Sequence, residues 1–136
     1  MALGVDGIQV ASRFVTTEEC DADIRYKEAY IKAAKEEIAI VKSPVGMPGR
    51  AILNPFMKRV MDGEKFDPEE MSGCLHKCEP AKIPYCITER LVAAAKGEVE
   101  EALLFCGEGA YRQQEITTVG DVIQSLMGEE KRQDER

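Results

Sequence analysis

The feature that most constrains the fold is a short apolar run close to the start of the chain. Val5, Ile8 and Val10 lie in this run, with Gly7 between them. A short apolar run bounded by glycine predicts a buried strand. A parallel strand that is buried on both faces needs neighbouring strands at both edges and helices on both faces, and the few residues before Val5 are too short to supply them. The sequence therefore predicts a strand from the interior of a sheet that is larger than this chain.

The composition is that of a soluble globular domain. The 136 residues are 44% hydrophobic and 32% charged, with a formal net charge of -7. Because nucleic acid is bound by a basic face, the acidic balance predicts no nucleic-acid partner. No apolar run approaches the ~20 residues that cross a bilayer, and the start of the chain lacks the pattern of a signal peptide, so we expect no membrane partner. Five cysteines are an odd number without a secretion signal, which predicts reduced thiols in a cytoplasmic protein.

The rest of the chain predicts several helices and little sheet. β-branched residues at 38–42 predict a second strand, and residues 103–106 are a candidate third one. Periodicity, caps and turn residues predict the other elements: a helix from Asp23 to Glu37, a loop with fixed turns over 43–56, a short helix from Pro55 to Met61, irregular chain over 62–85, a helix from Cys86 to Lys96 ended by Gly97, and a last helix capped by Thr118 with Val119, Val122, Ile123 and Leu126 on one face. We expect one domain over 1–127 and a solvated, disordered tail over 128–136.

Three stretches carry a resemblance to a known family. They are ALGVDGIQVASRFVTTEEC (2–20), SPVGMPGRAILNPF (43–56) and PYCITERLVAAAKGEVEEALLFCGEGAYR (84–112). In this order they resemble the C-terminal part of the nitronate monooxygenase family, also called 2-nitropropane dioxygenases, which includes flavin-type enoyl-acyl-carrier-protein reductases. The resemblance implies an α/β fold, namely the last strand and the C-terminal helical extension of a (β/α)8 TIM barrel. Because a complete barrel takes ~250 residues, we expect the barrel to be incomplete in this chain.

The resemblance also implies FMN as the cofactor and a phosphate site where the first strand ends. It implies that Gln9, Ala11 and Ser12 bind the cofactor, with the backbone amides of Ala11 and Ser12 and the Ser12 hydroxyl meeting the phosphate. Backbone amides and a short helix N-terminus hold phosphate in many barrels of this class. Family members more often carry Gly-Thr at the positions of Ala11 and Ser12. From the residues alone, a strand-to-loop turn with an N-cap is the simpler interpretation.

The activity implied by the resemblance is the oxidative denitrification of alkyl nitronates with O2 by an FMN-dependent monooxygenase. Two alternatives stay open: NAD(P)H-dependent reduction of an enoyl thioester, and a non-catalytic remnant or association module. The family's general base, a histidine, belongs to an earlier part of its sequence, and His76 does not correspond to it, so no catalytic residue is assigned. We expect a small-molecule substrate, no activity from this chain alone, and association with the missing barrel half or with copies of itself.

Other candidate residues have simpler interpretations. Cys74, His76, Cys78 and Cys86 are possible metal ligands, but their spacing is not a standard one, so reduced thiols are favoured and no metal site is predicted. For the remaining candidates, we expect Tyr26 and Tyr30 to pack in the core, Arg13 to pair with Glu18 or Glu19, Met47 to fill a gap, and Gly107 and Gly109 to form a bend with Tyr111 and Arg112.

Overall fold

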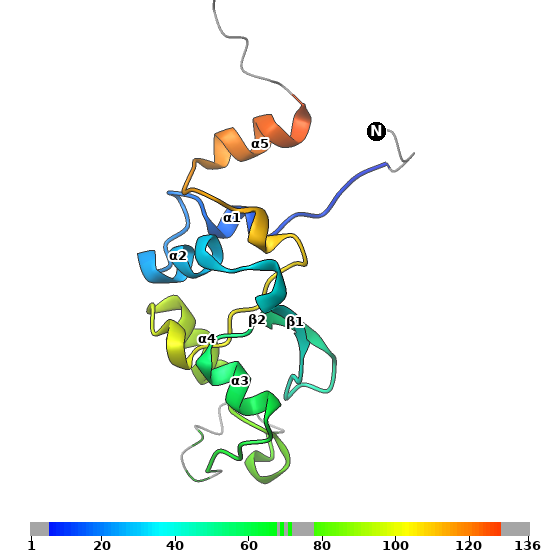
Figure 1. Ribbon diagram of the computed structural model, residues 1–136, viewed down its shortest axis with the longest axis vertical. Helices are drawn as coiled ribbons and strands as arrows, with labels where there is room; N and C mark the ends of the chain where they lie inside the picture. Colours follow the sequence, from blue (N-terminus) through cyan, green and yellow to red (C-terminus); the bar gives the residue numbers. More distant parts are fainter. Residues whose placement is uncertain (1–5, 68, 70, 72–77, 129–136) are drawn as a thin grey trace, which may run out of the picture.

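The computed structural model describes residues 6–67, 69, 71 and 78–128 (Figure 1). The fold is mixed α/β. Its elements in chain order are α1 (Ser12–Val15), α2 (Ile24–Lys32), η1 (Lys35–Glu37), β1 (Ile38–Val41), β2 (Gly49–Ile52), α3 (Pro55–Met61), η3 (Pro80–Lys82), α4 (Ile87–Ala95), η4 (Val99–Glu101), η5 (Ala110–Arg112) and α5 (Val119–Met127).

A β-hairpin lies at the centre of the fold. β1 and β2 pair antiparallel, with Ala39 opposite Ala51, and Gly46 in the connection has a φ of 81° that favours glycine. The expected strand at 38–42 is confirmed as β1. The expected loop over 43–56 is correct for the connection but wrong for β2, because hydrogen bonding to β1 turns a glycine- and arginine-containing stretch into a strand.

A third segment runs along the free edge of β2. The backbone N–H of Ile52 donates to the carbonyl oxygen of Leu104 at 3.0 Å, and that of Cys106 donates to Arg50 at 2.9 Å. Phe105 forms a single antiparallel bridge with Ala51. The candidate strand at 103–106 therefore adds to the sheet, although its pairing is too short to form a full ladder.

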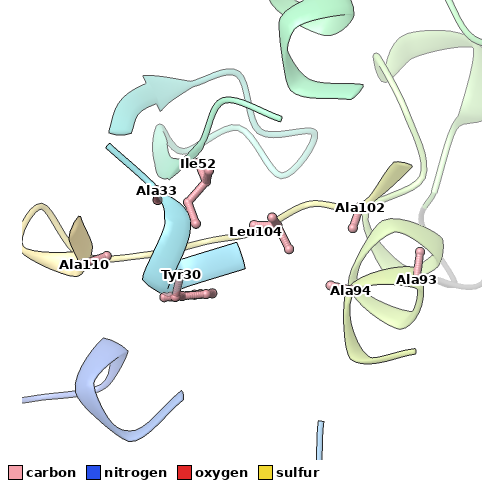
Figure 2. Close-up of a cluster of buried hydrophobic side chains, with 8 residues drawn as sticks. All are labelled: Tyr30, Ala33, Ile52, Ala93, Ala94, Ala102, Leu104 and Ala110. Carbon is pink, nitrogen blue, oxygen red and sulfur yellow. The ribbon is translucent and has the colours of Figure 1, made fainter. Parts of the chain in front are cut away.

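Two clusters of buried side chains share this small sheet. Figure 2 shows the first, to which α2, β2, the 102–104 segment, α4 and η5 contribute Tyr30, Ala33, Ile52, Ala93, Ala94, Ala102, Leu104 and Ala110. The second is formed by Val41, Ala51, Phe56, Met57, Val60, Tyr85 and Leu103. Since β2 and the neighbouring segment supply residues to both clusters, the hairpin region connects the α2 side of the molecule to the α3 side.

Local capping explains where most helices begin and end. α3 begins at Pro55 as expected, and the Asn54 side chain accepts the backbone N–H of Met57 at 2.9 Å. α4 is followed by Gly97 with a φ of 78°, which confirms the expected left-handed stop. The expected helix from Asp23 is shorter than predicted, because Ala33 adopts an extended conformation and ends α2 at Lys32.

The last helix follows its predicted cap but buries less of its apolar face than expected. The Thr118 hydroxyl accepts the backbone N–H of Asp121 at 3.1 Å, so the cap is confirmed. Val122 is buried, whereas 49% of Ile123 is exposed. Figure 1 shows why: α5 lies at one end of the molecule beside α1, away from the hairpin.

The predicted first strand is the main correction. Residues 7–11 form neither a helix nor a strand, and 60% of Ile8 is exposed. In Figure 1 the segment extends away from α1 with no strand beside it. A strand needs a hydrogen-bonding neighbour as well as β-branched residues, and the described part of the chain offers none here.

Two further expectations concern the ends of the chain and its hydropathy. Gly128, with a φ of 74°, caps α5, and the expected tail beyond it lies outside the described residues. No helix among the described residues is long and apolar enough to cross a membrane.

Candidate functional site

The predicted cofactor-binding residues lie at the start of α1. Gln9 is exposed in the extended segment, Ala11 is the residue before the helix, and Ser12 is its first residue. The first N–H groups of a helix have no partner within the helix. Within the described residues, no other group accepts a hydrogen bond from the backbone amides of Ala11 and Ser12. The structure thus places two available amide donors and one hydroxyl together at the start of α1, and Gln9 belongs to the segment that leads into it.

The Ser12 hydroxyl is held by a loop that lies far away in the sequence. The backbone N–H of Gly107 donates to Ser12 Oγ at 2.7 Å. A Cβ atom added at Gly107 would lie 3.3 Å from the same oxygen, so the approach suits glycine. Because a hydroxyl that accepts one hydrogen bond keeps its own proton, Ser12 can still donate to a ligand. Sequence reasoning missed this contact, since nothing in the spacing of Ser12 and Gly107 indicates it.

The Gly107–Gly109 bend forms as expected and continues into η5. Glu108 within it lies 3.6 Å from the Arg50 guanidinium in an exposed ion pair. Tyr111 follows, with the Lys35 ammonium 6.0 Å from its ring centre. Charged and aromatic side chains therefore belong to the bend and to η5, while Gly107 makes the direct contact with Ser12.

The turn after α1 is held by a bridge to Thr117 and by a hydrogen bond from Lys27. Thr17 forms a parallel bridge with Thr117, in which Glu18 N–H donates to the Thr117 carbonyl at 2.8 Å and Thr117 N–H to the Thr16 carbonyl at 3.1 Å. On the other side, the Lys27 ammonium donates to the Thr17 carbonyl at 2.7 Å. A helix of four residues has little stability of its own, so these contacts set the position of α1.

Arg13 does not pair as predicted. The Glu19 carboxylate accepts the backbone N–H of Val119 at 3.0 Å, at the start of α5. Among the described residues, Arg13 forms no ion pair with Glu18 or Glu19, and its Nε is buried without a hydrogen-bond partner. The position of the α5 N-terminus explains the difference, because its amide takes the acid that the sequence offers to Arg13.

The two tyrosines of α2 pack in the core, as predicted. Tyr30 is buried, its hydroxyl donates to the Phe105 carbonyl, and it lies 3.2 Å from the Tyr26 hydroxyl. Burial raises the pKa of Tyr30 well above its usual range. Burial also raises the pKa of the half-buried Cys106 thiol to about 11. Both residues are therefore neutral at ordinary pH, and neither is activated as an acid or a nucleophile.

The remaining candidates are placed or corrected as follows. Cys74 and His76 lie outside the described residues, so the cysteine and histidine cluster is not placed; Cys78 is half-buried and Cys86 buried. Met47 was expected to fill a gap and does not, because 70% of it is exposed at the tip of the hairpin.

Comparison with known proteins gives this arrangement a context. The sequence model of the family described as nitronate monooxygenase matches residues 1–129. A probable nitronate monooxygenase from Staphylococcus saprophyticus is 28% identical over 69 residues, which are 51% of this chain and 19% of that protein.

Solved structures agree at the level of the fold. The structure of FabK from Thermotoga maritima superposes with a TM-score of 0.71 and 24% identity, over 93% of this chain and 37% of that one. Its M276A mutant superposes with a TM-score of 0.68 and 23% identity, over 94% of this chain and 35% of the mutant. The chain thus spans about a third of these structures and about a fifth of the curated relative. Since the family match takes in α1, the hairpin and every helix to α5, the chain belongs to the nitronate monooxygenase family.

Proposed function

We propose that this protein is an FMN-dependent oxidoreductase and that Ala11 and Ser12 bind the phosphate of FMN. The observation that carries the proposal is the start of α1, where two backbone amides and the Ser12 hydroxyl are available as donors within a chain of this family. Charge-assisted hydrogen bonds from amides and hydroxyls are the usual means of holding a phosphate at a helix start.

The residues around this point fit a phosphate group. The buried, unpartnered Nε of Arg13 is a cationic donor on the same short helix. Gly107 approaches Ser12 Oγ so closely that a Cβ would press on it, which leaves the hydroxyl oriented by a backbone amide. An anion would satisfy donors that the protein itself leaves open.

When bound, FMN supplies the oxidation–reduction chemistry, and the protein binds and orients it. Ala11 and Ser12 would donate to the phosphate. Gly107 would keep the Ser12 hydroxyl turned toward it. No side chain described here is assigned as the catalytic base, and His76 is given no role.

For the reaction, we propose the oxidative denitrification of alkyl nitronates with O2, in line with the family to which the chain belongs. The fold shared with FabK supports one alternative, the NAD(P)H-dependent reduction of an enoyl thioester. A second alternative is a non-catalytic association module. The five cysteines support a cytoplasmic protein, and the family supports a small-molecule substrate.

We also propose that residues 7–10 form a strand when the rest of a (β/α)8 barrel is present. The segment is extended, Ile8 is 60% exposed, and the matched FabK structure contains much chain that this one does not. The partner would be a polypeptide with the remaining barrel strands, or a second copy of this chain. An unpaired apolar edge readily recruits another strand.

Flavin content and two assays separate these proposals. For the chain co-purified with a polypeptide that supplies the remaining barrel strands, bound flavin, O2 uptake with an alkyl nitronate and no NADPH oxidation with an enoyl thioester would support the nitronate reaction. The reverse pattern of activity would support the reductase. A soluble, oligomeric protein that binds no added FMN would support the module and contradict the cofactor proposal.

The 136-residue chain by itself is predicted to be inactive toward nitronates. No general base is assigned in it, and the start of α1 is a small part of what an FMN barrel uses to hold its cofactor. The measurement is O2 uptake with an alkyl nitronate and added FMN, with free FMN as the control. Turnover well above that of free FMN would contradict this prediction.

A further inference from the structure

Lys27 is a buried lysine whose partners are backbone carbonyl groups. Only 7% of its surface is exposed, on the side of α2 that faces the turn after α1. Its ammonium donates to the carbonyl oxygen of Thr17 at 2.7 Å and to that of Glu18 at 3.3 Å. In the part of the chain that is described, no carboxylate forms an ion pair with it. Because burying a charged group is costly unless it is well hydrogen-bonded, this contact must hold the two carbonyls firmly.

The two carbonyls belong to the turn that follows α1 directly. α1 has only four residues, and one turn of helix is not stable by itself. Its first residue is held by the bond between Ser12 Oγ and Gly107 N–H, and the turn at its other end by Lys27 and the bridge to Thr117. Lys27 is the charged side chain among these contacts, and it reaches the turn from a different helix. Lys27 therefore connects α2 to the turn that ends α1.

We propose that Lys27 is a positioning residue for phosphate binding. By fixing the carbonyls of Thr17 and Glu18, its ammonium keeps α1 in the orientation in which the amides of Ala11 and Ser12 meet the phosphate. Lys27 acts through α1 and need not touch the ligand. This inference rests on the phosphate contact proposed above and adds a residue that the contact depends on.

The test compares the binding of FMN and riboflavin, which share the same ring system and differ by the phosphate. Dissociation constants are measured by flavin fluorescence on the full chain. In the wild type, FMN should bind at least about tenfold more tightly than riboflavin, the effect of one charge-assisted hydrogen bond or more. Lys27→Met should lose most of this preference by weakening FMN binding, with riboflavin binding nearly unchanged. A variant that is merely less well folded would weaken both ligands alike.

Lys32→Met is the matched control. Lys32 lies on the same helix, but its ammonium is exposed and pairs with Glu28 at 2.8 Å. This variant should keep the wild-type preference for FMN. If Lys27→Met does not fold, Lys27→Gln keeps a donor with a shorter reach and should reduce the preference by about threefold.

The outcomes distinguish the two levels of the proposal. A wild type that binds FMN no better than riboflavin would overturn the phosphate contact, and this inference with it. A wild-type preference that persists in folded Lys27→Met or Lys27→Gln would overturn the role of Lys27 alone. Equal weakening of both flavins in the Lys27 variants would also overturn it, since the residue would then be structural only.

Discussion

β1 and the segment at residues 7–10 have similar sequences and different structures. Both are short apolar runs with β-branched residues. β1 pairs with β2 along its whole length and covers a core that includes Val41. Residues 7–10 pair with nothing among the described residues, and Ile8 is largely exposed. The comparison teaches that a strand sequence becomes a strand where a partner edge and a buried face are both within reach.

The largest expected effect comes from comparing the truncation of a leucine in the core covered by the hairpin with the truncation of an isoleucine in residues 7–10. Leu103→Ala removes a fully buried side chain from the second cluster and should lower the free energy of unfolding by about 2–5 kcal/mol. Ile8→Ala should change it by about 0.5 kcal/mol or less, because Ile8 is already in contact with water. Urea unfolding followed by circular dichroism measures both. Equal losses would show that residues 7–10 are buried in solution and would remove the contrast.

A second pair of variants compares a helix cap in the body with one at the periphery. Asn54→Ala removes the cap of α3 and also leaves the carbonyls of Val99 and Ala102 without the Nδ2 donor at 2.6 and 2.7 Å. A loss of about 2–4 kcal/mol in the free energy of unfolding is expected. Thr118→Ala should cost about 1 kcal/mol and act on α5 alone.

Hydrogen exchange distinguishes the two cap variants. Thr118→Ala should speed amide exchange in α5 and leave the hairpin unchanged, because α5 contacts mainly α1. Asn54→Ala should speed exchange in the hairpin and α3 together. Faster exchange in the hairpin of Thr118→Ala would mean that the periphery and the body unfold as one unit.

The smallest expected effect is an acid dependence at the start of α2. Hydrogen bonds from the Arg25 side chain and backbone N–H lower the pKa of Asp23 to about 2. A lowered pKa in the folded state means that this contribution to stability is present above pH 4 and is lost as the pH falls toward 2. Asp23→Asn should therefore lower the melting temperature slightly at pH 5 and hardly at all at pH 2.

Arg25→Met tests the same interaction from the other partner. At pH 5 this variant should lower the melting temperature more than Asp23→Asn does, since the Arg25 guanidinium also donates to the Lys96 carbonyl at 2.9 Å. The difference in melting temperature between the wild type and Asp23→Asn should shrink from pH 5 to pH 2. A difference that stays the same over this range would show that the ion pair contributes nothing, and would contradict the lowered pKa of Asp23.

Local signals predicted much of the secondary structure. Pro55 and Asn54 start α3, Thr118 starts α5, and Gly97 follows α4, because each acts on backbone groups a few residues away. β2 was missed because its residues have weak strand propensity and depend on β1. Met47 was misplaced for a similar reason, since an apolar residue in a turn is exposed unless another part of the chain covers it.

The candidate site was predictable only in part. The family resemblance indicates Ala11 and Ser12, and the structure places both at the start of α1, while the phosphate contact itself stays a proposal. Gly107 and Lys27 gave no sequence signal, because their contacts join residues far apart in the chain or on separate elements. The predicted pairing of Arg13 with Glu19 was wrong, because the Glu19 carboxylate accepts the backbone N–H of Val119.

By itself the sequence determined the caps of α3 and α5, the glycine stop after α4, the strand β1 and the family, because caps, glycines and motif spacing act locally or persist across relatives. Only the tertiary structure decided that Gly107 holds Ser12, that Lys27 fastens the turn after α1 and that residues 7–10 stay unpaired. Those outcomes depend on which distant backbone groups come within hydrogen-bonding reach, and the order of residues along a chain does not specify that.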